Sequence, residues 1–303
     1  MSTAEALRTV CAIQQTPGFA PSSTALALAV GRELGTSLDG LRTATDADLV
    51  RMFGWSGIQL RAFHAHLTAP LGRFERFVAR GIRVSTRLDS DLPGWCDRLP
   101  STPWFYYLGD IAVLDTPSIG FSGSRDAGEE ALRITRTVAS ESVAHGMTVI
   151  SGGARGVDMA AHTVALDAGG CTVVLVPQGL DTWNPPYPLV DSRVDDRVLV
   201  LSEDLPWAGW TTPSAMQRNR AIVDLSELIV IPQAGTGGGS ASTGKYALGR
   251  KRDLWVADLG DEAPGNQALL RRGASPLPWI EDVPDIALMR APTAVTPAQQ
   301  SLF

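Results

Sequence analysis

The sequence predicts a doubly wound α/β domain with a mostly parallel sheet, preceded by a small all-helical domain. From about residue 117, apolar runs of four to six residues alternate with helical stretches of ten or more, which is typical of βα units. Runs such as "CTVVLV" and "LIVI" are continuously apolar, which indicates strands that are buried on both faces. Hydrophobic residues make up 44% of the chain, enough to fill such a core.

The first 78 residues carry the pattern of short helices. The stretches "STALALAVGRELG" and "DADLVRMFGWSGIQLRAFHAHL" have apolar residues at three- and four-residue spacing, with Ser, Thr or Asp as expected N-caps. We therefore expect a helical domain, SAM-like or similar, at residues 1–78 and the α/β domain at 79–288. The stretch 87–110, rich in Pro, Asp and aromatic residues, predicts a loop-like connector, and residues 289–303 a flexible tail.

Strands and helices alternate in order along the α/β domain. "SIGFSG" predicts a strand that runs into glycine, and the amphipathic helix after it ends at Gly146. "MTVI" predicts the next strand, and the helix "ARGVDMAAHTVALDAG" is closed by Gly169. Further strands are expected at "CTVVLV", "RVLVLSE", "ELIVIPQ" and "DLWVAD", and further helices at "AMQRNRAIVDLS" and "SASTGKYALGRK".

Charge and cysteine usage narrow the function classes. The formal net charge is −6, so there is no global basic field, and any site for a polyanion has to be a local patch. Cys11, Cys96 and Cys171 are odd in number and far apart, which fits neither a disulfide framework nor a zinc site and suits a reducing cytoplasm. The sequence shows no signal peptide and no apolar run of about eighteen residues, so no membrane span is expected. It points to no metal and no cofactor.

Three glycine-rich loops follow predicted strands. They are "SGSR" (122–125), "SGGARG" (151–156) and "PQAGTGGGSASTG" (232–244). In an open parallel sheet, ligands bind at the carboxyl ends of the strands, where the loops to the helices lie. Each loop opens a helix, so backbone N–H groups and helix dipoles are expected to converge on an anion. Three such loops in one sheet predict a ligand that carries phosphate.

None of the loops matches a named catalytic or nucleotide motif. There is no G-x-x-x-x-G-K-[ST], no strict G-x-G-x-x-G and no G-x-S-x-G. Arg155, Asp158 and His162 are spaced to share one helical face. They form either a ligand site, with Arg155 on a phosphate and Asp158 or His162 on a sugar or base, or a capping and packing network under the loop.

The stretch "QRNRAIVDLS" places two arginines at the expected start of a helix. There they work against the helix dipole, which calls for another explanation. Arg218 and Arg220 either contact a phosphate or pair with Glu203 or Asp204. Two tryptophans lie just upstream, Trp207 and Trp210, and either offers a stacking platform or packs into the fold.

Taken in order, these motifs resemble the DNA-processing protein A (DprA/Smf) family. That family has a G-S-R turn, then S-G-x-A-x-G-I-D-x-x-A-H, G-x-D, S-E, R-N-R and a loop of small residues. The corresponding stretches here are "GSR" (123–125), "SGGARGVDMAAH" (151–162), "QGLD" (178–181), "SE" (202–203), "RNR" (218–220) and "GGGSASTG" (237–244). The resemblance covers roughly residues 75–275.

The resemblance implies an extended Rossmann-like domain that binds single-stranded DNA, protects it and helps to load the RecA recombinase in transformation or recombination. It also implies a homodimer in the cytoplasm without catalytic turnover. The alternative is a nucleotide-binding or nucleotide-hydrolysing domain of the wider LOG-like superfamily, with phage defence as one setting. The expected DNA- or phosphate-binding residues are Gly123, Ser124, Arg125, Ser151, Gly152, Gly153, Arg155, Gly156, Arg218, Asn219, Arg220, Gly237, Gly238, Gly239, Ser240 and Lys245, supported by Asp158, His162 and Glu203.

The last five residues, "QQSLF" (299–303), resemble the bacterial sliding-clamp-binding motif. In that motif the glutamine makes polar contacts and a Leu-Phe pair fills an apolar pocket of the clamp. Gln299, Leu302 and Phe303 match by position, and a flexible tail that ends on two large apolar side chains suits a partner-binding peptide. A chance match, or a tail that folds back onto the protein, is the alternative.

Overall fold

A computed structural model of the chain describes residues 1–303 except 92, 187–188, 190–195 and 292–303. Packing divides the chain into two compact units, one of residues 1–116 with 172–225 and one of residues 117–171 with 226–303. The clamp-like motif at Gln299, Leu302 and Phe303 lies outside the described residues. Within the part that is described, no helix is both long and apolar enough to cross a membrane.

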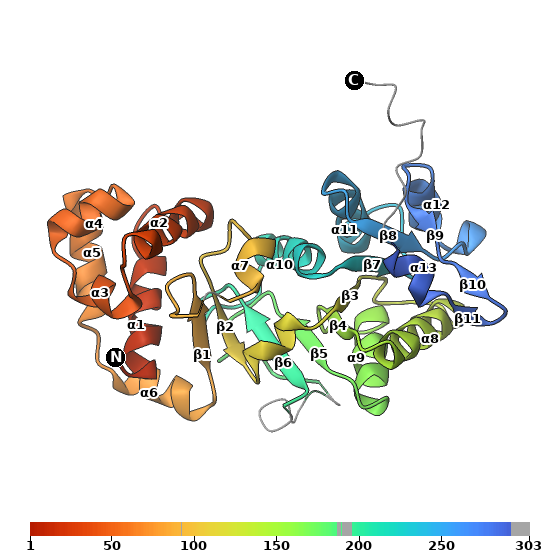
Figure 1. Cartoon of the computed structure of the whole chain (residues 1–303), viewed down its shortest axis with the longest axis horizontal. Coiled ribbons are helices and arrows are strands. Elements are labelled where there is room, and N and C mark those ends of the chain that lie inside the picture. The colour runs from red at the N-terminus through yellow and green to blue at the C-terminus, as the bar shows by residue number, and fades with distance from the viewer. Residues whose placement is uncertain (92, 187–188, 190–195, 292–303) are drawn as a thin grey trace, which may run out of the picture. The chain divides into compact units, whose positions relative to one another are not determined.

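The first unit begins with six helices. Figure 1 shows them gathered around α1, which packs against α3, α5 and α6. Their buried side chains include Leu7, Ile13 and Phe63, so the apolar spacing found in the sequence faces the interior. The helices are α1 (Thr3–Gln14), α2 (Pro21–Glu33), α3 (Leu38–Thr43), α4 (Asp46–Phe53), α5 (Gly57–Leu67) and α6 (Gly72–Ala79).

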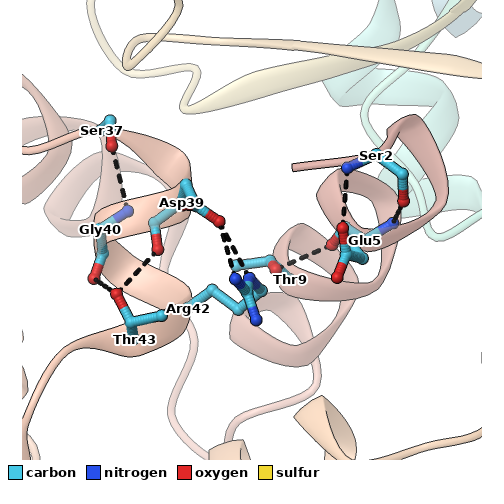
Figure 2. Close-up of polar contacts among 8 residues, drawn as sticks. All are labelled: Ser2, Glu5, Thr9, Ser37, Asp39, Gly40, Arg42 and Thr43. Atoms are coloured by element: carbon cyan, nitrogen blue, oxygen red, sulfur yellow. Dashed lines mark hydrogen bonds and ion pairs between the residues drawn. The ribbon is translucent and has the colours of Figure 1, made fainter.

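Side-chain caps fix several of these helix starts. At α1, the Ser2 hydroxyl accepts a hydrogen bond from the backbone N–H of Glu5 at 3.2 Å, while the Glu5 carboxylate accepts one from the Ser2 N–H at 2.7 Å (Figure 2). This reciprocal pair satisfies two backbone donors that the helix leaves open. At α3, Ser37 accepts from the N–H of Gly40 at 3.0 Å. By contrast, α2 begins at a proline without a side-chain cap.

The strands of the first unit lie in the order β1-β2-β6-β5. The pairs β1–β2 and β2–β6 are antiparallel, and β5–β6 is parallel. The strands are β1 (Arg83–Thr86), β2 (Trp104–Leu108), β5 (Thr172–Leu175) and β6 (Val198–Ser202). Two short helices, α7 (Trp95–Arg98) and η1 (Ile111–Asp115), flank β2, and the longer α10 (Thr212–Leu225) packs against α7 and β5.

Strand β2 corrects the expected loop-like connector at residues 87–110. Trp104, Phe105 and Tyr106 are each at most 1% exposed, and the strand is hydrogen-bonded on both sides. The prolines and aspartates around it dominate the composition of the stretch and hide a short aromatic strand. Aromatic residues favour a strand that is covered on both faces.

All the main strands of the second unit are parallel, in the order β4-β3-β7-β8-β9. They are β3 (Ser118–Phe121), β4 (Thr148–Ser151), β7 (Leu228–Ile231), β8 (Asp253–Val256) and β9 (Ser275–Pro276). A small antiparallel pair, β10 (Trp279–Ile280) and β11 (Val283–Pro284), follows. The helices are α8 (Glu129–Ala144), α9 (Val157–Asp167), η3 (Gly260–Glu262), α11 (Gly238–Gly249), α12 (Pro264–Leu270) and α13 (Ile286–Arg290).

Helices cover both faces of these parallel strands. On one face, side chains of α8, α9 and α13, such as Val138, Ala161 and Met289, share a core with Phe121 of β3. On the other face, α11 packs so closely against α12 that a Cβ on Gly244 of α11 would meet Leu269 of α12 at 2.6 Å. Figure 1 shows α8 and α9 on one side and α11 and α12 on the other. The predicted fold class, a mostly parallel α/β fold after a helical N-terminal part, is confirmed.

Candidate functional site

The three glycine-rich loops of the second unit meet at the carboxyl ends of β3, β4 and β7. The backbone N–H of Ser124 donates to the carbonyl of Gln233 at 2.8 Å, and the N–H of Val157 donates to the carbonyl of Ser124 at 3.2 Å. The Gln233 side chain accepts from the N–H of Gly128 at 2.9 Å and donates to the carbonyl of Glu262 at 3.0 Å. The first loop is therefore bonded to the third loop and to Val157, the residue that directly follows the second loop.

Two glycines let these loops approach each other. A Cβ on Gly156, which has a φ of +81°, would lie 2.3 Å from the carbonyl oxygen of Ser124. A Cβ on Gly123 would lie 2.3 Å from the side chain of Val157. Packing between loops is thus enough to require glycine here. In the third loop, a Cβ on Gly237 or Gly238 meets nothing within 4 Å, so that backbone is open to a ligand.

The helices behind the loops differ at their N-termini. Helix α11 begins at Gly238 with no acidic residue in its first turn. Helix α8 carries Glu129 and Glu130 in its first turn, and α9 carries Asp158, whose carboxylate accepts the N–H of Ala154 at 3.3 Å. Negative side chains already occupy the favourable end of those two dipoles. Among these three helices, α11 therefore has the charge pattern that best suits an anion, and the prediction for the other two stays a prediction.

Both loop arginines of the second unit lie at the surface. Arg155 pairs with Asp126 at 2.9 Å, yet the Arg155 side chain remains 74% exposed and that of Asp126 77% exposed. An ion pair this exposed is weak and is screened by salt, so the guanidinium is available to a phosphate. Arg125 is also exposed, as is Lys245 on α11.

The polar residues beneath the second loop support capping and packing. Asp158 is 7% exposed and His162 is fully buried, so both side chains lie under the loop rather than on its outer surface. Ser151 is buried as well, and its hydroxyl donates to the carbonyl of Phe121 at 2.8 Å. Of the three residues spaced to share one helical face, Arg155 alone reaches solvent to any large extent.

The remaining predicted residues belong to the first unit. Helix α10 begins at Thr212, so Arg218 lies almost two turns inside it and not at its start, as the sequence suggested. Arg218 is 9% exposed and donates from Nη1 to the carbonyl of Leu175 at 3.2 Å. Asn219 is half-buried and Arg220 is exposed.

Two carboxylates follow β6 in the first unit. Glu203 accepts hydrogen bonds from the Thr102 hydroxyl at 2.8 Å and from the side chain of Gln217, and Asp204 accepts one from Ser214 at 3.0 Å. Burial raises the pKa of Glu203 and that of Asp204 above their usual values.

The two tryptophans upstream of α10 have different surroundings. Trp207 stacks on Phe77, with ring centroids 6.1 Å apart, and the Arg73 guanidinium lies 3.7 Å from its ring centroid. The ring of Trp207 therefore already makes its contacts with residues of the first unit. Trp210 is 52% exposed and is the better candidate for a stacking platform.

Asn266 is a positioning residue that the sequence did not reveal. Its side chain is fully buried. Its Nδ2 donates to the carbonyls of Ile231, Pro232 and Ala257 at 2.8–3.2 Å, and its Oδ1 accepts from the N–H of Ala234 at 2.9 Å. It fixes the start of the third loop from below. A single Asn after a Pro-Gly pair has no sequence pattern that announces such a role.

A parallel α/β fold with glycine loops meeting at the carboxyl ends of its strands defines a Rossmann-like binding protein. The family model of DNA recombination-mediator protein A matches residues 83–287. The chain belongs to this family, which confirms the resemblance of the ordered motifs.

Curated relatives of the family match over much of this chain. DNA processing protein DprA of Streptococcus pneumoniae is 27% identical over 227 residues, which cover 72% of this chain and 76% of the relative. Protein Smf of Synechocystis is 30% identical over 195 residues, 61% of this chain. That match spans 49% of the Synechocystis protein, about half its length.

Solved structures agree with the fold. The X-ray structure of DNA processing protein A from Streptococcus pneumoniae matches with a TM-score of 0.72 at 21% identity, covering 89% of this chain and 94% of the other. DNA processing protein A from Helicobacter pylori, in a structure that describes its single-stranded DNA binding mode, matches with a TM-score of 0.55 at 32% identity. That match covers 64% of this chain and 90% of the Helicobacter protein.

Proposed function

We propose that this protein binds single-stranded DNA as a recombination mediator and helps to load RecA in transformation or recombination. The observation that carries the proposal is the loop cluster of the second unit. There three loops meet, with exposed Arg125 and Arg155 and an α11 N-terminus free of acidic residues. Membership of the family and the similarity to the Helicobacter protein support nucleic acid as the ligand.

The chemistry of the cluster fits phosphate better than base edges. Backbone N–H groups at a helix N-terminus and arginine side chains contact phosphates without reading sequence. Trp210 adds an exposed ring on which a base can stack, and stacking tolerates every base. We therefore propose binding with little sequence preference, and we assign the protein no catalytic turnover.

We further propose that the protein works in the cytoplasm as a homodimer, and that its tail binds the sliding clamp through Gln299, Leu302 and Phe303. The clamp proposal is supported by sequence alone. A peptide of residues 290–303 should compete for the clamp pocket, and Leu302→Ala with Phe303→Ala should abolish the competition. No clamp binding by the whole chain at high micromolar concentration would contradict it.

Titration of labelled oligonucleotides at several salt concentrations tests the main proposal. Single strands should bind more tightly than duplex of the same length, and affinity should fall as salt rises because phosphate contacts release counterions. Equal affinity for duplex, or binding that ignores salt, contradicts the proposal. A nucleotide-hydrolysis assay run in parallel distinguishes it from a nucleotide-processing enzyme.

A further inference from the structure

A cavity of about 230 Å³ lies within the first unit. Its walls come from the end of α1, the start of α2, β2, the ends of β5 and β6, and α10, all within that unit. Pockets for drug-sized ligands have volumes of roughly 300–1,000 Å³. This cavity therefore suits a smaller ligand, about the size of one planar ring system.

One wall of the cavity is aromatic. The rings of Phe19 and Trp104 are stacked, with centroids 5.5 Å apart and planes 23° apart, and Phe105 adjoins them. Trp104 is 1% exposed and Phe105 is fully buried, so their rings only hold Phe19 in place, and the half-buried Phe19 ring is the aromatic surface left for a ligand. Fixed aromatic rings of this kind favour flat heterocycles, which gain by stacking.

Two carboxylate residues and Arg218 also line the cavity. Glu203 and Asp204 both line it, held by Thr102, Gln217 and Ser214 as described above. A carboxylate offers about four acceptor positions. The donors that hold these two groups leave acceptor capacity for a ligand.

Two further hydrogen bonds hold the backbone at Glu203. The buried hydroxyl of Tyr106 donates to Gln14 Oε1 at 2.8 Å, and Gln14 Nε2 donates to the backbone carbonyl of Glu203 at 2.9 Å. Burying carboxylates costs free energy that apolar residues would not cost. A cavity that keeps two of them, held by neutral donors, is built for a ligand that donates hydrogen bonds.

We propose that this cavity binds a nucleobase with an exocyclic amino group: cytosine, adenine or guanine. The ring stacks on Phe19, and the amino group donates to Glu203 or Asp204, the pairing by which carboxylates recognise cytosine N4. Thymine and uracil lack that donor.

The base could belong to a bound strand or to a free nucleoside, and the test separates the two sources. The strand version rests on the proposed function, whereas the nucleoside version does not. Isothermal titration of the full chain with cytidine, adenosine, guanosine and uridine measures the cavity alone. Titration with oligodeoxycytidylate and oligodeoxythymidylate of equal length measures the strand.

At least one amino-bearing nucleoside should bind about tenfold or more tightly than uridine, the discrimination expected of one good base contact. Glu203→Gln and Asp204→Asn should each reduce that ratio towards one. Asp97→Asn, which removes an exposed carboxylate of α7 in the same unit, should keep it. If Glu203→Gln unfolds, the wild-type ratio and Asp204→Asn still decide.

Each outcome has a defined meaning. Equal binding of all four nucleosides, or none by any, together with equal binding of the two oligonucleotides, overturns the inference. A nucleoside preference without an oligonucleotide preference supports the cavity as a site for a free ligand. Failure of both oligonucleotides to bind refutes the proposed function, and the nucleoside titration then decides the cavity independently.

Discussion

Arg155 and Arg218 both belong to motifs of the family, but the structure gives them opposite surroundings. Arg155 in the second unit stands at the surface beside Asp126, with its side chain 74% exposed. Arg218 in the first unit is 9% exposed and bonds to the carbonyl of Leu175 at the end of β5. The first can leave its partner for a ligand without disturbing the fold, and the second cannot. A motif arginine is therefore a ligand contact, a structural element or both, according to burial.

The largest effect is expected where the loops of the second unit touch. Gly156→Ala should lower the free energy of unfolding by about 3 kcal/mol, because its φ is positive and its Cβ would strike the Ser124 carbonyl. Urea denaturation measures this. Gly249→Ala, at an open position of α11, is the control and should change stability by less than about 1 kcal/mol. Equal stability of the two variants would show that the loops are not tightly packed.

The second-largest effect is expected for Arg218→Ala. It removes a donor from the buried carbonyl of Leu175 and should cost about 2 kcal/mol of stability. Binding of single strands should fall as well if Arg218 also contacts DNA. Arg218→Lys keeps the charge without the planar fork and separates the two roles. An Arg218→Ala variant that melts like the wild type would show that the fold does not depend on Arg218.

Arg155→Ala should affect the binding of single strands more than the stability of the fold. Stability should change by less than about 0.5 kcal/mol, because its only described ion pair is exposed. Single-strand affinity should fall several-fold, and the dependence of log affinity on log salt should lose about one unit of slope. Arg272→Ala, an exposed arginine elsewhere in the unit, is the control. Normal binding together with earlier melting would assign Arg155 to packing.

The smallest effect concerns pH. The pKa of Glu203 is raised above its usual 4.5 by burial, so the folded state binds a proton more tightly than the unfolded state. The contribution of this group to stability is fully present below 4.5 and is lost as the pH rises through the raised value. Glu203→Gln should therefore flatten the stability–pH curve above 4.5. An unchanged curve in thermal melts would contradict the assignment.

Sequence reasoning found what local pattern encodes. Continuous apolar runs predicted the parallel strands, and the glycine loops predicted the edge where they meet. Local pattern could not predict burial that depends on residues distant in the chain. Strand β2 was hidden among prolines, Arg218 looked like a residue at a helix start, and Trp207 gave no sign of its Phe77 and Arg73 neighbours. Asn266 was missed because four backbone groups, three of them distant in the chain, define its role.

The Asp126–Arg155 pair has a kinetic consequence. If Arg155 contacts a phosphate as proposed, Asp126, tethered to the same loop cluster, competes with that phosphate for the guanidinium. A phosphate that leaves Arg155 is replaced at once by the carboxylate, which favours short residence times at each contact. Asp126→Asn should slow strand dissociation and also speed association, because it removes an exposed negative charge that the strand meets on approach. Under the proposed function, competition from Asp126 lets the protein hold a strand and still release it.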